Sequence, residues 1–580
     1  MVRKRFTSTI AIAAALGMTF LVGACNDDNS PTPTPAATLS EQNALKTTTP
    51  IKHLVVIFGE NESFDHYFGT YPQEAGTTSG QTWVAPSNVA SPNNYVRNAA
   101  LLTANPNKLN ADNGGVNSTT GIASNLMNPF LLLPAQYDTT SQNHAYTPEQ
   151  QATNNGKMDA FVKYTGRGTA GGAGAFGTAA QVMGYFDGST VTGLWNYAQN
   201  YAMSDNAFTD SFGPSTPGAI NVISGNTGGA DKLVTGSTIA DGQGAFTVTG
   251  DPDPTGDVCS NTNIVTTLAG PNIGDLLNAN KITWGGFMGG FDPTITNTNG
   301  TNANSAGVKG CGRSTVSPHT TRTVNDYIPH HAWFQYYNST LNKNHTRPSS
   351  VAMIGHTEAN DAPGGATAVN HQYDLHDFID AVKSGNFPSV SYIKAQAFQD
   401  AHPGNSNPLD EQDFVTNLVN FLMNQPDWAS TAIIIAYDDS DGWYDHLAPT
   451  ILTQSLDATA DQVSGPGSCT GPSALPAYSP AGKVINGRCG PGTRTPLIVI
   501  SPYARQNYVD SHPVTQASVV RFIEDNWLSS KRLGSGSNDA TTGDLGTLFD
   551  FNQTPRTAKF CLGTDGKKAA STGNCTSTFS

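Results

Sequence analysis

Two short polar clusters in this 580-residue chain follow apolar runs that are rich in β-branched residues. Glu60 and Asn61 follow the first run, and Asp438 and Asp439 follow the second. Adjacent carboxylates repel each other at close range, and a bound cation relieves that repulsion. Oxygen ligands suit a hard cation, so the clusters together favour one divalent metal ion, Ca²⁺ first with Mg²⁺ or Mn²⁺ as alternatives, over Zn²⁺. For either cluster alone, a helix cap or a solvated loop remains the simpler interpretation.

A serine with a stiff backbone is the candidate nucleophile. Ser215 lies in the sequence Phe-Gly-Pro-Ser-Thr-Pro-Gly at residues 212–218. Glycine and proline on both sides predict a sharp turn that presents one hydroxyl outward. The spacing differs from the Gly-x-Ser-x-Gly elbow of acyl hydrolases, and a plain turn is the alternative interpretation.

Histidines in loops rich in glycine and proline complete the set of candidate residues. They are His144, His330, His331 and His402. A serine oxygen can attack phosphorus, a hard metal can lower the pKa of that serine, and histidines can neutralise the phosphate oxygens. Taken together, these residue types match phosphoryl transfer. A single loop histidine is more often structural, so the histidines only support the serine and the polar clusters.

The elements that position these residues alternate between strands and helices. Buried strands are predicted from apolar runs at residues 51–58, 389–393, 431–437 and 496–501. Helices with one apolar face are predicted at residues 372–383, 411–424 (capped by Asp410) and 514–528. This alternation predicts an α/β fold around a largely parallel sheet. Such sheets bind ligands beyond the carboxyl ends of their strands, where both polar clusters stand.

The amino-terminal segment predicts export. Residues 1–24 combine a basic start, an apolar run and small residues at the end, as a signal peptide does. Cys25 at the cleavage point indicates a bacterial cell-envelope lipoprotein, anchored to the membrane through this cysteine; an ordinary signal with an incidental cysteine is the alternative. Residues 25–50 are rich in proline and threonine and predict a tether. The domain is then expected at residues 51–580.

Composition and cysteine count bound the function further. The formal net charge is -15 and no basic patch emerges, which predicts that nucleic acid is not a partner. Six cysteines follow Cys25, and an even number in an exported protein predicts three disulfides. The sequence alone does not choose among the pairings. Proximity along the chain favours Cys259–Cys311, Cys469–Cys489 and Cys561–Cys575.

Three loop-rich stretches interrupt the predicted elements. An insertion at about residues 225–323 is rich in glycine, threonine and asparagine, and we interpret it as a disulfide-stapled lid over the site, or else a disordered excursion. The Gly/Ala-rich loop at residues 166–177 lacks the spacing of a phosphate-cradling P-loop. From about residue 533 the chain becomes a tail rich in glycine, serine and threonine.

The motifs resemble, in their order, those of the bacterial phosphoesterase family that contains phospholipases C and the respiratory-burst-inhibiting acid phosphatase. Glu-Asn-Glu-Ser-Phe-Asp-His-Tyr-Phe-Gly at residues 60–69 is similar to the family's opening motif. The motifs that follow in family order are Gly-Pro-Ser-x-Pro at 213–217, His-His at 330–331, Asp-Ala-His-Pro-Gly at 400–404 and Asp-Asp at 438–439. The resemblance covers roughly residues 51–530. It implies an alkaline-phosphatase-like fold.

The resemblance also implies a role for each candidate residue. The implied metal ligands are Glu60, Asn61, Asp438, Asp439 and, as nucleophile and fifth ligand, Ser215. The implied phosphate pocket is lined by His144, His330, His331 and His402.

Three features are similar to the acid phosphatase branch of the family. The basic start of the leader is not the twin-arginine signal usual in the phospholipases. Gly218 and Ala219 stand where those enzymes have Asn-Arg, and about 50 residues follow the last predicted helix, too few for two added β domains. The prediction is therefore a metal-dependent acid phosphatase that acts on phosphorylated small molecules through a phosphoserine. The alternatives are a phospholipase C that cleaves phosphatidylcholine-type phosphodiesters and recognises phospholipid head groups, and a surface lipoprotein that binds ligands without turnover.

Overall fold

A computed structural model describes residues 39–76, 78–113, 127–295, 310–358, 371–569 and 573–579. The expected leader, the acylated Cys25 and the first part of the tether lie outside these residues. Within the described ranges, no helix has both the length and the apolar character needed to cross a membrane.

An eight-stranded sheet forms the centre of the domain. Its strands, in spatial order, are β14 (Gln372–Asp374), β11 (Trp284–Met288), β15 (Val390–Lys394), β1 (His53–Gly59), β16 (Thr431–Tyr437), β20 (Leu497–Ile500), β4 (Ala202–Ser204) and β21 (Tyr508–Asp510). Seven of these strands run in one direction, and β20 is antiparallel to both of its neighbours. The predicted α/β fold with a largely parallel sheet is confirmed, and so are the four predicted strands.

The register between the two central strands explains why the polar clusters meet. Gly59 on β1 pairs with Tyr437 on β16, so that Glu60 and Asp438 are the next residues of two adjacent parallel strands. Both strands are fully buried and consist of apolar residues apart from His53 and Thr431. Burial on both sides of the sheet selects such continuous apolar runs, and it leaves the first polar residues at the sheet edge.

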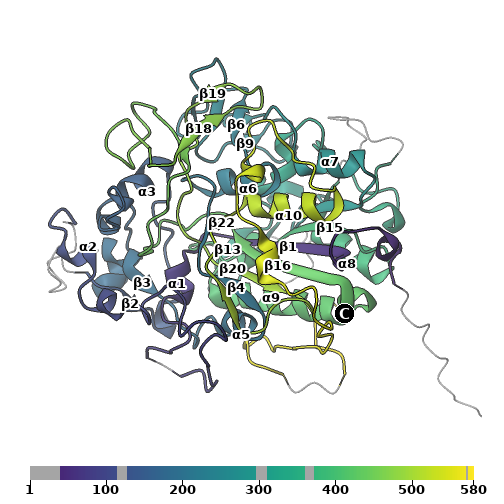
Figure 1. Cartoon of the computed structure of the whole chain (residues 1–580), viewed down its shortest axis with the longest axis horizontal. Helices are drawn as coiled ribbons and strands as arrows, with labels where there is room; N and C mark the ends of the chain where they lie inside the picture. The colour runs from purple at the N-terminus through teal and green to yellow at the C-terminus, as the bar shows by residue number, and fades with distance from the viewer. Residues whose placement is uncertain are drawn as a thin grey trace, which may run out of the picture. The chain divides into compact units, whose positions relative to one another are not determined.

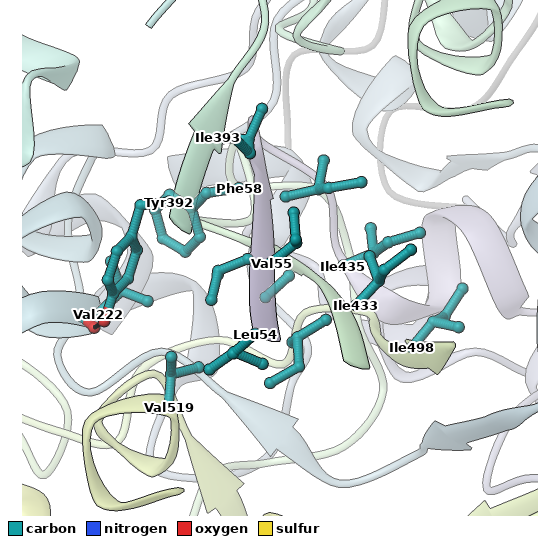
Figure 2. Packing of buried hydrophobic residues seen from close by; sticks show 14 of the residues in the cluster. Leu54, Val55, Phe58, Val222, Tyr392, Ile393, Ile433, Ile435, Ile498 and Val519 are labelled. Atoms are coloured by element: carbon teal, nitrogen blue, oxygen red, sulfur yellow. Dashed lines mark hydrogen bonds between the residues drawn. The ribbon is translucent and has the colours of Figure 1, made fainter. Parts of the chain in front are cut away.

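Helices cover both faces of the sheet (Figure 1). The α-helices are α1 (Phe64–Phe68), α2 (Pro106–Leu109), α3 (Tyr146–Thr153), α4 (Phe161–Tyr164), α5 (Thr192–Asn200), α6 (Ser215–Ser224), α7 (Ile273–Ala279), α8 (Leu375–Lys383), α9 (Pro408–Met423) and α10 (Ala517–Trp527). Figure 1 places α6 and α10 on one side of the central strands and α5 and α9 on the other. The packing is shown in Figure 2, where Val222 of α6 and Val519 of α10 lie against apolar side chains of the sheet. Helix α6 is therefore fixed on the sheet by its carboxyl-terminal half.

Three helix starts differ from the prediction. The helix predicted at 514–528 begins at Ala517, because residues 514 and 515 form the short strand β22 (Val514–Thr515). Helix α9 begins at Pro408, because the side chain of Asn407 accepts hydrogen bonds from the next backbone N–H groups and caps the helix in place of Asp410. The predicted helix at 372–383 begins at Leu375, since Asp374 forms a capping box with Asp377 and the three residues up to Asp374 form strand β14.

Small sheets and disulfides organise the loop-rich stretches. The short strands are β2 (Phe130–Leu131), β3 (Gly184–Tyr185), β5 (Ala207–Phe208), β6 (Gly228–Ala230), β7 (Thr238–Ala240), β8 (Phe246–Val248), β9 (Asp253–Pro254), β10 (Val265–Thr266), β12 (Ser314–Val316), β13 (Thr323–Asn325), β17 (Thr453–Gln454), β18 (Leu475–Tyr478), β19 (Val484–Ile485) and β22 (Val514–Thr515). The three predicted disulfides, Cys259–Cys311, Cys469–Cys489 and Cys561–Cys575, are present. The stretch 225–323 also contributes β11 to the central sheet, so it is not one separate insertion. That its loops act as a lid stays a prediction.

Both predicted extensions are packed on the domain where the structure describes them. Ser40 donates its backbone N–H to Asp427, and Thr48 donates to the backbone of Asn526. Residues from Ser40 onward are therefore packed on the domain, although the tether was expected to extend to residue 50. In the tail beyond residue 533, Leu545 and Leu548 are buried in the core.

A buried acidic pair joins the tail to α10. Glu524 is fully buried, and its carboxylate accepts the backbone N–H of Leu533 at 2.6 Å, which Asp539 also accepts at 2.7 Å. Burial, together with the neighbouring Asp539, raises the pKa of Glu524 to about 8.

This pair predicts a loss of stability with rising pH. Glu524 holds its proton in the folded state up to about pH 8 but loses it near pH 4.5 in the unfolded chain. The folded state therefore binds more protons in that window, and its stability falls as the pH rises through it. The variant Glu524→Gln keeps an N–H donor for Asp539. It should reduce the difference in unfolding free energy between pH 5 and pH 8 by on the order of 1–2 kcal/mol. Urea unfolding at pH 5 and pH 8 measures this difference in unfolding free energy. An equal difference in the wild type and the variant would contradict the prediction. Glu41→Gln, at an exposed position, is the matched control.

Candidate active site

The hydroxyl of Ser215 lies at the centre of the two polar clusters. Its Oγ is 3.0 Å from Glu60 Oε2, 3.2 Å from Asp439 Oδ2 and 3.4 Å from Asn61 Oδ1. Residues from three distant parts of the chain thus converge at the carboxyl ends of β1 and β16. Ser215 is only 2% exposed, and its hydroxyl points into the cluster. The sequence analysis had predicted that the turn presents this hydroxyl outward, and that prediction is wrong.

The local sequence explains how the serine reaches this position. Gly213 has φ +119°, a conformation that side chains rarely allow, and Pro214 then caps α6, of which Ser215 is the first residue. Gly218 lies on the same helix, where an added Cβ would be only 2.1 Å from the backbone oxygen of Asp438. The helix can therefore approach the end of β16 because residue 218 is a glycine. The positive end of the α6 dipole favours an anion near Ser215.

The acidic side chains are arranged as a cation would require. Burial raises the pKa of Asp438, and burial together with the neighbouring Asp438 raises that of Asp439 well above its usual range. Asp438 Oδ2 is buried without a hydrogen-bond partner among the described residues. The Ser215 hydroxyl faces three acceptor oxygens but has only one hydrogen to donate. An all-oxygen donor set with excess negative charge fits a hard divalent cation, so the five predicted ligands suit the predicted metal.

The four predicted histidines surround this cluster. His331 Nδ1 is 3.0 Å from Glu60 Oε1, and its ring lies 4.5 Å from that of His330. On the other side, His144 Nδ1 is 3.0 Å from Asp441 Oδ1, and its ring lies 6.1 Å from that of His402. The structure thus brings all the predicted site residues together.

The histidines differ in their expected protonation. Burial tends to lower the pKa of His144, but the carboxylates of Asp439 and Asp441 outweigh it and raise this pKa well above its usual range. Burial and the other three histidines lower the pKa of His331 well below its usual range, and burial lowers that of His402. His144 is therefore the histidine most ready to carry a positive charge.

Several charged residues of the site were not predicted. Lys394, the last residue of β15, forms a buried ion pair with Glu60 and lies 4.0 Å from Asp438 Oδ2. Asp400 lies with Glu60 and His331 in a group whose potential ligand atoms are all within 4.8 Å of one another, and Asp441 forms a similar group with His144 and His402. Nitrogen ligands are thus closer to the cluster than we expected. Lys394 could have been predicted as a site residue, because it comes directly after a predicted strand, as Asp438 does.

A buried arginine ties the two polar clusters together. Arg494 donates from Nη2 to Asp65 at 3.0 Å and from Nε to Asp445 at 3.0 Å. Asp65 lies on α1, directly after the first cluster, and Asp445 lies in the loop after the second. The arginine is fully buried, and its planar fork matches two carboxylates. It therefore fixes the position of one cluster relative to the other.

A cleft of about 470 Å³ adjoins the start of α6. It is lined by His144 and by Pro214, which precedes Ser215. The cleft offers a place for the part of a substrate that extends from the reacting group.

An acidic cluster thus surrounds a serine at the strand ends of a largely parallel sheet, and the α/β fold is of the alkaline-phosphatase-like type. The chain belongs to the Phosphoesterase family, whose model matches residues 51–528.

Three relatives among characterised proteins are phospholipases C. The non-hemolytic phospholipase C of Pseudomonas aeruginosa is 30% identical over 180 residues, which are 30% of this chain and 25% of that protein. The hemolytic phospholipase C of the same organism is 32% identical over 171 residues, 29% of this chain and 22% of that protein. Phospholipase C A of Mycobacterium tuberculosis is 27% identical over 189 residues, 32% of this chain and 33% of that protein. None of these three is an acid phosphatase, so they do not support the predicted branch.

Proposed function

We propose that this phosphoesterase hydrolyses phosphodiesters of the phospholipid type, as its named relatives do, through a phosphoserine at Ser215. The observation that carries the mechanism is the position of Ser215 Oγ within 3.4 Å of three separate ligand-type oxygens. The names of the relatives support the diester substrate.

In the proposed mechanism, Ser215 Oγ attacks phosphorus and the ester bond to the leaving oxygen breaks. The serine proton passes to a carboxylate that its hydroxyl already contacts, Glu60 or Asp439. Glu60, Asn61, Asp438, Asp439 and Ser215 would hold the cation. When bound, this ion would lower the serine pKa and offset the charge of the phosphoryl group.

Histidines complete both halves of the proposed reaction. Protonated His144 gives its proton to the leaving alkoxide, and the neutral His331 or His402 then accepts a proton from the water that attacks the phosphoserine. This second attack breaks the bond between phosphorus and Ser215 Oγ and releases the phosphoryl product. Ser215 regains its proton from Glu60 or Asp439, and His331 or His402 gives up its proton to solvent while His144 takes one up again. We further propose His330 as a neighbour of the phosphate oxygens.

Phosphomonoester hydrolysis is the second candidate. Gly218 and Ala219 stand where the resemblance places Asn-Arg in the phospholipases. Because an added Cβ at residue 218 would be 2.1 Å from the Asp438 backbone oxygen, asparagine does not fit in this arrangement of α6. This observation favours the acid phosphatase branch, so a phosphomonoester is included among the substrates to be tested.

Turnover of two substrates under identical conditions tests the assignment. We expect kcat/KM for phosphatidylserine in mixed micelles to exceed that for p-nitrophenyl phosphate. The reverse order would replace the diesterase with the monoesterase, and no turnover of either substrate by metal-loaded protein would overturn both.

We also propose that the protein is exported and anchored through Cys25. Three disulfides support an oxidising compartment. Labelling of expressing cells with a fatty-acid analogue should modify the full-length protein but not Cys25→Ser, and equal labelling of both would contradict the anchor.

A further inference from the structure

Arg167 lines the cleft beside Ser215 without an ion-pair partner. The cleft is lined by both Arg167 and His144, together with Asp251. The side chain of Arg167 is exposed, and among the described residues no carboxylate pairs with its guanidinium. Asp251, by contrast, is engaged, because its Oδ1 accepts the Thr216 backbone N–H at the start of α6 at 2.9 Å. Arg167 is therefore the charged side chain of the cleft that is free to pair with a ligand of opposite charge.

The glycine-rich loop at residues 166–177 holds Arg167 in place. An added Cβ at Gly166 would be 2.1 Å from the Ala179 backbone oxygen, and one at Gly168 would be 2.4 Å from the Gly177 backbone. The loop can thus fold back on itself only with glycine at these positions. Arg167 also donates its backbone N–H to Gln142 Oε1 at 2.7 Å, and Gln142 is two residues from His144. The loop and the histidine are therefore positioned together.

The cleft is poorly suited to a quaternary ammonium group. Sites for such groups are built from the faces of several aromatic rings. Apart from the His144 imidazole, Tyr146 has the one aromatic ring among the described residues that line the cleft, and it is buried with its hydroxyl donated to Asp461 at 2.7 Å. A guanidinium in place of aromatic faces favours an anion.

We propose that the cleft binds the polar group esterified to the reacting phosphate and that Arg167 selects substrates in which this group carries a second negative charge, a carboxylate or a phosphate. The inference rests on the proposed phosphoester hydrolysis at Ser215 and adds the class of substrate. Within the lipid class, it favours head groups of the phosphoserine kind over choline.

Matched pairs of soluble substrates test this selectivity. Phosphoserine and phosphoethanolamine differ by one carboxylate, as do their glycerophospho diesters, whereas propanediol bisphosphate and monophosphate differ by one phosphate. We expect the wild type to prefer the anionic member of at least one pair by about fivefold in kcat/KM, the scale of an exposed ion pair. Arg167→Gln should bring that ratio near unity, and Arg167→Glu should invert it. The pair that responds identifies which anion is selected.

The controls distinguish a failure of this inference from a failure of the proposed phosphoester hydrolysis. Arg97→Gln, at an exposed arginine that lines a different cleft, should leave the ratio unchanged. Equal ratios in the wild type and both Arg167 variants, with turnover of p-nitrophenyl phosphate or its bis ester present, would overturn the role of Arg167 alone. Absence of any turnover would overturn the proposed function instead.

Discussion

Ser215→Ala is expected to lower kcat by at least about 10³-fold, because a nucleophile acts only in the chemical steps. Ser215 Oγ is the atom that faces Glu60, Asn61 and Asp439, and alanine leaves no oxygen at that position. Steady-state turnover of the preferred ester, with the far-ultraviolet circular dichroism spectrum as a check on folding, measures the effect.

The matched control lies on the same helix. Ser224 is also buried, and its hydroxyl donates to the Ile220 backbone oxygen at 2.9 Å. Ser224→Ala should cost about 1 kcal/mol of stability and leave kcat within a few-fold of wild type. Near-native turnover by Ser215→Ala would indicate direct attack by water on the substrate.

Asp439→Asn is expected to weaken metal binding and turnover together. Replacing residues that only support a metal ligand costs roughly 10- to 100-fold in metal affinity, so loss of a ligand should cost at least about 100-fold. Asp438→Asn should behave similarly, since its Oδ2 is a buried oxygen without a hydrogen-bond partner in the described structure. Calorimetric titration of chelator-treated protein with Ca²⁺, Mg²⁺, Mn²⁺ and Zn²⁺ gives the affinities and the preferred ion.

Metal content must be measured beside activity, because slow release can mask dependence on the ion. Asp241→Asn is the control, since that buried carboxylate accepts two backbone N–H groups within its own loop. It should leave metal affinity and turnover unchanged. Full activity in protein shown to contain no metal would contradict the predicted metal dependence.

The sequence predicted the centre of the site because its determinants are local. Residues 51–58 and 431–437 are apolar without interruption, and this pattern is typical of strands that are buried on both sides. Parallel neighbours end at the same sheet edge, so the residues after these runs had to lie close together. The turn around Ser215 was visible from its glycines and prolines, although the direction of the hydroxyl was not.

The features that the sequence analysis did not predict depend mostly on contacts between residues far apart in the chain. Strand β11 contains two adjacent glycines, which weaken any local strand signal. The ion pair of Lys394 with Glu60 joins residues 334 positions apart, and Arg494 reaches Asp65 across 429 positions. Asp410 had the right residue type for a helix cap, but Asn407 followed by Pro408 provides a better start for the same helix.

The stereochemical course at phosphorus tests the central claim most directly. Hydrolysis or transfer from an ester made chiral with oxygen isotopes reports whether phosphorus is attacked once or twice. Attack by Ser215 Oγ followed by attack of water on the phosphoserine inverts the phosphorus twice. The account therefore predicts net retention, and net inversion would contradict it.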